Sequence, residues 1–375
     1  MKIKCLNQVL TDNINIVIRA ISSRTTMDIL ECVLITAESG SFRLFASNLE
    51  MSIETDEITE AEIIEEGRVV VDGRMLSDIM RRLDQDKMVS ISSEAASIIK
   101  IECGKSEFRL VGLNPEEYPT LPFVEQGHVY RLGALQFKNM LRQTIYCAAQ
   151  DNIKPVFTGA LIECRTDDNV LSIVALDGVR MAYAAQNLTE GEPQAPLKIV
   201  VPARALTEIL KASSSDDEFI SFYATDKHAL FQLKGATLVT RLLEGDFIDY
   251  EQIFNVEQST LVTCDRQSLL AGLERASLIA VKETRKSPVR LDISEETLKI
   301  TSNAQIGTVN DEIDIDMDGS ALQIGFNPRY LIDAIKAIDD EFITLSLNSP
   351  LSPCIIRPAG ESSHKHLVLP LRLEG

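Results

Sequence analysis

The sequence lacks any apolar run that approaches the ~18 residues needed to cross a membrane as a helix. Residues 1–13 also lack the uninterrupted apolar segment of a signal peptide, so we expect a cytoplasmic protein. The seven cysteines are scattered singly, with no CxxC pair. An odd number of scattered cysteines favours reduced, mostly buried thiols over a disulfide framework.

Motifs for catalysis and metal binding are missing as well. There is no GxxxxGK phosphate loop and no GxGxxG after an expected strand, which argues against ATP hydrolysis and dinucleotide chemistry. The four histidines show no HExxH or Cys/His zinc spacing, and we expect His364 and His366 to be exposed to solvent. The acidic segment 314–318 imitates the start of an EF-hand loop, but Gly325 stands where the bidentate glutamate is needed. We therefore predict no catalytic residue, no metal site and no cofactor.

Positive charge is scarce overall, because 37 Lys and Arg stand against 56 Asp and Glu, for a net charge of −19. Taken alone, that balance argues against a nucleic-acid partner. Its distribution reverses this conclusion, since the segments that read as helices hold 18 basic and 8 acidic residues. These segments are 4–24, 72–83, 131–150, 202–212, 265–286 and 327–338. Basic helices within an acidic remainder suit a protein that holds DNA phosphates at one surface only, although exposed helices often carry such charges for solubility alone.

Three of these helices repeat one pattern. Each has an arginine near its start and a second basic residue seven places later, which returns to nearly the same side of a helix. Apolar residues one, two, five, six and nine places after the arginine should form the opposite, buried face; in the first copy they begin with Met75 and Leu76. The repeated basic pairs, which we propose as DNA contacts, are Arg74 and Arg81, Arg204 and Lys211, and Arg329 and Lys336.

The same spacing organises the whole chain. The three arginines lie 130 and 125 residues apart, which is the length of an ordinary domain, and Asn48, Asp177 and Asn303 occupy equivalent points. We predict three related domains at residues 1–123, 124–253 and 254–375. Each reads as strand, helix, several strands, helix, several strands, which predicts an α+β fold with antiparallel sheets.

Five longer motifs occur along the chain: DGVRM at 177–181, VPAR at 201–204, RLLEGDFIDY at 241–250, NPRYL at 327–331 and LVLPLRL at 367–373. In sequence, order and separation they resemble the bacterial DNA polymerase III β subunit, the sliding-clamp family, over the full length. The resemblance implies a head-to-tail homodimer that forms a closed ring. Six clamp domains would place their antiparallel sheets outside and two helices each around the hole.

The resemblance further implies a non-catalytic processivity factor that encircles duplex DNA and tethers the replicative polymerase. Expected partners are double-stranded DNA of any sequence, a second copy of the chain, the DNA polymerase III α subunit, clamp-loader subunits and other proteins with a clamp-binding motif. Its location would be the nucleoid. Two alternatives remain open, namely a clamp-like paralogue that serves as a peptide-binding scaffold without DNA loading, and an enzyme with an unrecognised site.

Site residues also follow from the resemblance. It places DNA contacts at Arg24, Gln150, Lys154 and Arg204. It places the dimer interface at Phe108 and Leu110 on one side and at Leu278 and Ile279 on the other.

A pocket for short linear peptides is implied between the second and third domains. It maps to Phe157, Leu176, Gly178, Val179, Arg180, Met181, Ile248, Ile253, Leu367, Leu369, Pro370, Leu371 and Arg372. An apolar groove with a few polar groups suits an extended peptide with Leu or Phe anchors. Val179 stands where histidine is common and Ile248 where proline is common. Without the resemblance, the leucines at 367, 369 and 371 would read simply as one face of a terminal strand.

Overall fold

A computed structural model of the protein describes residues 1–22, 25–95, 97–120, 127–151, 153–165, 169–188, 195–212, 218–255, 257–280, 288–360 and 362–373. Within these ranges, no helix is both long and apolar enough to cross a membrane. The chain divides into two compact units. The first comprises Met1–Leu135 and Thr207–Leu242, and the second comprises Gln136–Leu206 and Leu243–Gly375.

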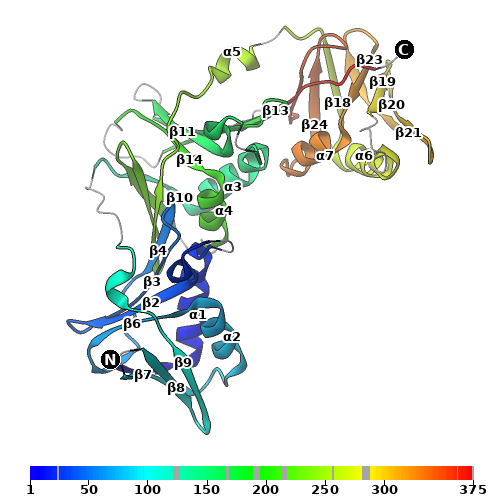
Figure 1. Ribbon diagram of the computed structural model, residues 1–375. Helices are drawn as coiled ribbons and strands as arrows, with labels where there is room; N and C mark the ends of the chain where they lie inside the picture. Colours follow the sequence, from blue (N-terminus) through cyan, green and yellow to red (C-terminus); the bar gives the residue numbers. More distant parts are fainter. Residues whose placement is uncertain are drawn as a thin grey trace. The chain divides into compact units, whose positions relative to one another are not determined.

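The first unit contains two antiparallel sheets (Figure 1). The five-stranded sheet has the order β5 (Glu62–Glu65), β1 (Lys2–Leu6), β7 (Met88–Ala95), β8 (Ile98–Cys103), β9 (Ser106–Val111). The eight-stranded sheet has the order β10 (Tyr130–Gly133), β15 (Phe219–Ala224), β16 (His228–Leu233), β17 (Ala236–Arg241), β4 (Met51–Thr55), β3 (Ser41–Ser47), β2 (Cys32–Glu38), β6 (Gly67–Asp72). Helices α1 (Asn7–Val17) and α2 (Gly73–Arg82) lie side by side and pack on these strands (Figure 1).

The second unit also contains two antiparallel sheets. The nine-stranded sheet has the order β14 (Leu197–Pro202), β11 (Gly159–Arg165), β12 (Val170–Leu176), β13 (Arg180–Asn187), β26 (His364–Val368), β25 (Cys354–Pro358), β24 (Phe342–Leu347), β18 (Thr260–Asp265), β22 (Asp316–Asp318). The four-stranded sheet has the order β21 (Gly307–Asp314), β20 (Thr297–Ala304), β19 (Val289–Ile293), β23 (Leu322–Phe326). Helices α6 (Arg266–Ala280) and α7 (Pro328–Lys336) pack against each other, and the short α5 (Tyr250–Phe254) precedes β18.

The remaining α-helices, α3 (Ala134–Thr144) and α4 (Ala203–Ala212), lie across the division between the units. With them, the order strand, helix, strands, helix, strands occurs three times along the chain. All six predicted helices are present and every strand pairing is antiparallel, so the predicted α+β class is confirmed.

Sheets that run through two repeats explain why the compact units differ from the repeats. Strand β17 of the second repeat pairs with β4 of the first, and β26 of the third pairs with β13 of the second. The units follow these shared sheets, whereas the boundaries proposed from the sequence follow the repeats. The turns at Asn48 and Asp177 are equivalent, because in each the side-chain oxygen accepts the N–H groups two and three residues further on. Asn303 differs, since it lies within β20 and pairs with Thr308 of β21.

Helix α2 shows why the repeated pattern folds as it does. The Asp72 side chain accepts the Met75 N–H at 2.7 Å and caps the helix, while Leu76, Ile79 and Met80 are buried. The prediction that Met75 is buried was wrong, since its side chain is 51% exposed. A residue one place after the arginine lies about 90° from the centre of the apolar face, at its flank, where solvent reaches it.

The interior corrects one further expectation and confirms another. His364 and His366 are buried, at 8% and 0% exposure, because β26 lies between β13 and β25 inside the nine-stranded sheet. All seven cysteines are free and buried, as the scattered spacing predicted.

Candidate DNA-facing helices and partner-binding surface

The basic pairs of the repeated helices are all exposed. Arg74 and Arg81 lie on α2, Arg204 and Lys211 on α4, and Arg329 and Lys336 on α7, each opposite buried apolar residues. Local partners hold several of them in place. These contacts are Arg81 Nη2 to Asn15 Oδ1 at 2.7 Å, Lys211 Nζ to Glu208 Oε1 at 3.0 Å, and Lys336 Nζ to Glu274 Oε1 at 2.7 Å. Because exposed ion pairs contribute little energy, a phosphate can compete for these cations.

The DNA contacts assigned only by resemblance lie elsewhere. Arg24 is outside the described residues. Gln150 and Lys154 are exposed in the segment that follows α3, off the helices themselves. The Lys154 ammonium lies 5.2 Å from the centre of the Phe157 ring, so it is next to a residue of the expected peptide pocket.

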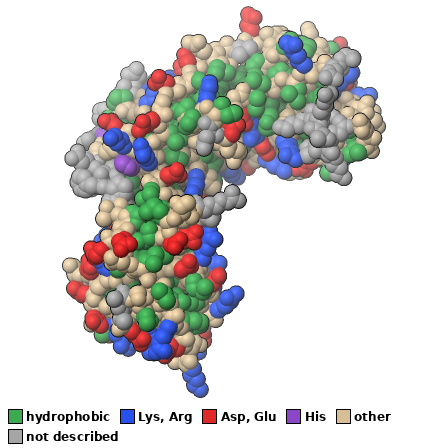
Figure 2. All heavy atoms as spheres, viewed as in Figure 1, with side chains coloured by type: hydrophobic (Ala, Val, Ile, Leu, Met, Phe, Trp, Pro, Cys, Tyr) green, Lys and Arg blue, Asp and Glu red, His purple; other side chains and the backbone are tan. Residues whose placement is uncertain are grey.

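Charge is not sorted by sign over the face that Figure 2 displays, where Asp and Glu side chains are spread among Lys and Arg. The net charge of −19 therefore says little about any one surface. A phosphate-binding surface has to be argued from individual helices.

The apolar part of the expected peptide pocket forms one cluster. Phe157, Leu176, Met181 and Leu367 are buried together in it, and Ile248 and Ile253 are partly buried against it. We call these six residues, together with Val179, Leu369, Pro370 and Leu371, the partner-binding surface. They come from the short 3-10 helix Pro155–Thr158, from β12, β13 and the turn between them, from β26 and the residues after it, and from the connector before β18, yet all belong to the same unit.

Three further residues of the expected pocket have exposed apolar side chains. Val179, Leu369 and Leu371 are 40%, 37% and 37% exposed. The Leu369 N–H donates to the Val179 carbonyl at 2.9 Å, and the Leu371 N–H donates to the Gly325 carbonyl at 2.8 Å. Strand β26 ends at Val368, so Leu369 and Leu371 lie beyond it and are not one face of a strand with Leu367.

Arg180 has a different environment from an open pocket rim. Its guanidinium donates to Asp177 Oδ2 at 2.9 Å, Asp333 Oδ2 at 2.6 Å and the Tyr146 carbonyl at 3.0 Å. It also lies 4.7 Å from the centre of the Tyr330 ring. Arg180 therefore ties β13 to α7, beneath the exposed turn formed by the neighbouring glycine and valine.

The last two residues of the expected pocket to be placed, at positions 370 and 372, differ in solvent exposure. Pro370 is partly buried and Arg372 is exposed. Gly178, in the turn before β13, has a φ of +93°, which favours glycine.

The residues assigned to a dimer interface lie on edge elements. Phe108 and Leu110 belong to β9, the last strand of its sheet, and both are partly buried. Leu278, 66% exposed, and the partly buried Ile279 lie at the end of α6. That helix packs on β20 and on the edge strand β21.

Sequence reasoning missed the partners of Arg180. Asp333 and Tyr146 are 153 and 34 residues away along the chain. Asp333 lies four places after Arg329 in α7, but no local pattern separates it from an ordinary exposed helix carboxylate. Only the folded arrangement identifies it.

Comparison with known proteins agrees with this architecture. The chain matches the families described as the N-terminal, central and C-terminal domains of the DNA polymerase III beta subunit at residues 1–122, 131–249 and 251–372. It is 31% identical to the "Beta sliding clamp" of Staphylococcus aureus over 367 residues, 96% of each chain. A DNA polymerase sliding clamp from Bacillus subtilis has 29% identity, full coverage of both chains and a TM-score of 0.94. The beta subunit from DNA polymerase of Streptococcus pyogenes has 27% sequence identity, full coverage of both chains and a TM-score of 0.92.

Proposed function

The chain belongs to the DNA polymerase III β subunit family of sliding clamps, and we propose that it works as a ring-shaped homodimer around duplex DNA. It is a DNA sliding clamp that tethers the replicative polymerase. In this proposal it catalyses no reaction itself. A separate clamp loader opens and closes the ring, and the loaded clamp works on the chromosome in the nucleoid.

The proposed DNA surface is the cationic face of the repeated helices. Arg74, Arg204 and Arg329 occupy the same place in three helices, and all three are exposed. Lys and Arg bind phosphates without reading bases, so such contacts exchange easily as the protein slides. Arg81, Lys211, Lys336, Gln150, Lys154 and Arg24 would add to them.

The proposed dimer joins two different sheet edges, one from each unit, between two subunits. Among the described residues, β9 and β21 each pair with one strand only, which leaves backbone N–H and C=O groups open at both edges. Antiparallel pairing of β9 with β21 of a second copy would satisfy these groups. It would also bring Phe108 and Leu110 towards Leu278 and Ile279. Because the two edges differ, the contact is head-to-tail and can close into a ring.

The proposed partner site is the partner-binding surface. Its exposed side chains, Val179, Leu369 and Leu371, are apolar, and six other members belong to a buried apolar cluster or pack against it, which suits the Leu or Phe anchors of an extended peptide. We propose that the DNA polymerase III α subunit, the clamp loader and other proteins with a clamp-binding motif share this surface. Arg180 would support it from below.

The observation that carries the proposal is the threefold recurrence of an exposed basic helix face in a chain of this family. Its test is retention on DNA. After loading by a clamp loader, the protein should stay on nicked circular DNA and be lost when the same DNA is cut once, because a ring slides off a free end. Equal retention on both forms would show direct binding, and no retention on either would favour a scaffold that does not load.

A further inference from the structure

The connector between the second and third repeats carries two residues of the partner-binding surface. It comprises residues 244–255 and includes the five-residue helix α5. Phe247, Tyr250 and Phe254 are buried in the apolar cluster, and Ile248 and Ile253 are partly buried against it. Whatever fixes the connector therefore also fixes these two isoleucines.

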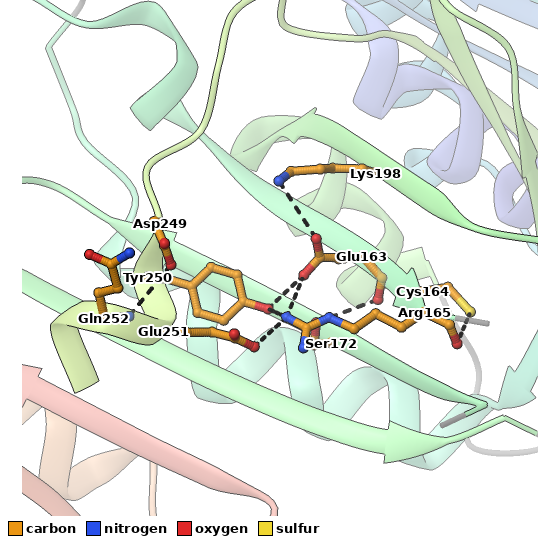
Figure 3. Close-up of polar contacts among 9 residues, drawn as sticks. All are labelled: Glu163, Cys164, Arg165, Ser172, Lys198, Asp249, Tyr250, Glu251 and Gln252. Atoms are coloured by element: carbon orange, nitrogen blue, oxygen red, sulfur yellow. Dashed lines mark hydrogen bonds and ion pairs between the residues drawn. The ribbon is translucent and has the colours of Figure 1, made fainter. Parts of the chain in front are cut away.

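Polar side chains hold the connector on the sheet of the second repeat (Figure 3). The Tyr250 hydroxyl donates to Glu163 Oε2 at 2.6 Å, and Arg165 Nη2 lies 3.1 Å from the same hydroxyl. Arg165 also forms an ion pair with Glu251, and Lys198 Nζ lies 3.6 Å from Glu163 Oε1. We call Glu163, Arg165, Tyr250 and Glu251 the connector latch.

The latch is built to keep Tyr250 as a hydrogen-bond donor. Burial raises the pKa of its hydroxyl, and the bond to Glu163 raises the pKa further, so the proton stays on the oxygen at all physiological pH values. The Glu163 side chain is only 13% exposed, so the hydrogen bond is largely shielded from water. A bond to a charged acceptor in such surroundings is stronger than one between neutral groups.

A second contact holds the far end of the connector. The Lys365 ammonium on β26 lies 4.3 Å from the centre of the Phe254 ring and 5.3 Å from that of Tyr183 on β13. The connector is thus attached to both repeats that contribute to the partner-binding surface. Ile253 lies between these attachments along the chain and Ile248 lies two residues before Tyr250, and neither side chain has polar atoms that could anchor it.

The connector between the first and second repeats is held by different contacts, and comparing the two connectors shows what the latch contributes. There Tyr118 donates to the backbone carbonyl of Cys32 at 2.6 Å, and Pro115 and Pro119 flank it and restrict the chain. Residues 243–258 contain no proline. The second connector must therefore obtain its rigidity from side-chain contacts.

We propose that the connector latch is a positioning device for partner binding, which holds Ile248 and Ile253 in the conformation that receives an apolar-anchored peptide. This inference rests on the proposed partner site. Without the latch, each peptide that binds would also have to order the connector, and that conformational cost would reduce affinity. The latch residues themselves need not touch the peptide.

The test compares matched tyrosine substitutions in the full-length protein. The probe is a fluorescein-labelled peptide copied from the clamp-binding segment of DNA polymerase III α subunit, and its Kd is measured by fluorescence anisotropy. Tyr250→Phe should weaken binding about tenfold, because it removes one hydrogen bond to a charged acceptor. Tyr118→Phe removes the equivalent hydroxyl from the first connector and should leave the Kd within about twofold.

Hydrogen exchange separates positioning from general loss of stability. Amides 247–254 should exchange faster in the Tyr250→Phe protein, and saturating peptide should restore their protection. Glu163→Gln retains a neutral acceptor and should weaken binding less than Tyr250→Phe. If both tyrosine substitutions changed the Kd equally, or if the connector exchanged at the unaltered rate, the latch proposal would be overturned. Failure of the unaltered protein to bind the peptide would instead overturn the proposed partner site, and the latch's role with it.

Discussion

Arg180 is the residue whose role changed most between sequence and structure. Its side chain is 13% exposed and satisfies two carboxylates and a backbone carbonyl, so it contributes to holding the second and third repeats together. A guanidinium in that position also pre-orders the turn that presents Val179. In the proposed function, partner binding and fold stability would therefore depend on the same side chain.

Arg180→Ala should lower the free energy of unfolding by about 3 kcal/mol, because it leaves Asp177 and Asp333 without their partner in a partly buried place. Urea denaturation followed by circular dichroism measures the change. Arg142→Ala is the matched control, since it breaks an ion pair with Asp339 whose side chains are 47% and 68% exposed. That change should cost less than about 1 kcal/mol. Similar losses for both variants would contradict the role given to Arg180.

His366 makes stability depend on pH. Burial, followed by the neighbouring His364, lowers its pKa from 6.5 to about 3. The native state keeps the ring neutral, with Nδ1 2.9 Å from the Tyr146 hydroxyl, whereas the unfolded chain takes up a proton below about pH 6.5. Stability is therefore unaffected by this group above that pH and falls as the pH drops from about 6.5 towards 3.

The expected slope from His366 is about 1.4 kcal/mol per pH unit in that window. His366→Gln keeps a polar group but cannot titrate, so its unfolding free energy should fall less steeply between pH 6.5 and 5. Urea denaturation at a series of pH values measures both slopes. Part of the dependence should survive in the variant, because burial also lowers the pKa of His364. Parallel curves for the two proteins would refute this account.

At the scale of elements, each repeated helix has a buried apolar face and an exposed basic face. Helix α7 is capped by Asn327, whose side chain accepts the Arg329 N–H at 3.1 Å, and Pro328 as its first residue favours that start. Leu331 and Ile335 are buried, while Arg329 and Lys336 are exposed on the other side. Packing thus fixes the direction in which the basic residues point.

The proposed DNA surface is tested by replacing the first arginine of each repeated helix, so that Arg74, Arg204 and Arg329 are all changed to Gln. Each lost phosphate contact should reduce the slope of log affinity against log salt by about 0.9. The slope is measured from equilibrium binding to a short linear duplex at increasing salt, where ring closure does not hold the protein on the DNA.

A control variant loses the same number of positive charges at positions outside the helices. Arg43, Lys234 and Arg357 are exposed on strands or turns, one in each repeat, and are changed to Gln together. The salt slope of the control should match that of the unaltered protein. An equal reduction in both variants would mean that total charge, and not the helix face, governs DNA binding.

At the scale of the whole molecule, function depends on closure of the ring. Buried apolar anchors dominate many interfaces, and Ile279 at the end of α6 is the anchor named from the sequence. Ile279→Asp should convert dimer to monomer, because a carboxylate would be buried without a partner. Sedimentation velocity measures the assembly state.

Leu351→Asp is the control for that experiment. Leu351 is 63% exposed in the loop between β24 and β25 and belongs to neither of the edge strands β9 and β21, and its replacement should leave the dimer intact. Circular dichroism should give the same spectrum for both variants. A dimer that persists with Asp at position 279 would remove this residue from the proposed interface.

The amino-acid sequence by itself determined the threefold repeat, the α+β class and the exposed basic faces, because these follow from local periodicity. A helix with apolar residues at the right spacing has to bury them, and the residues opposite then face solvent. The same argument failed for Met75 at the flank of its helix, where the angle is marginal. Scattered cysteines were correctly expected to be buried and free.

Only the tertiary structure decided which distant groups meet. Three contacts show this: His366 with Tyr146, Arg180 with Asp333, and Tyr250 with Glu163. The residues in each pair are between 87 and 220 positions apart along the chain. No local pattern encodes such contacts. They arise because β13 and β26 are neighbours in one sheet and the connector packs against that sheet. The sequence therefore specified the three repeats, and the way they share sheets specified the surface that we propose for partner binding.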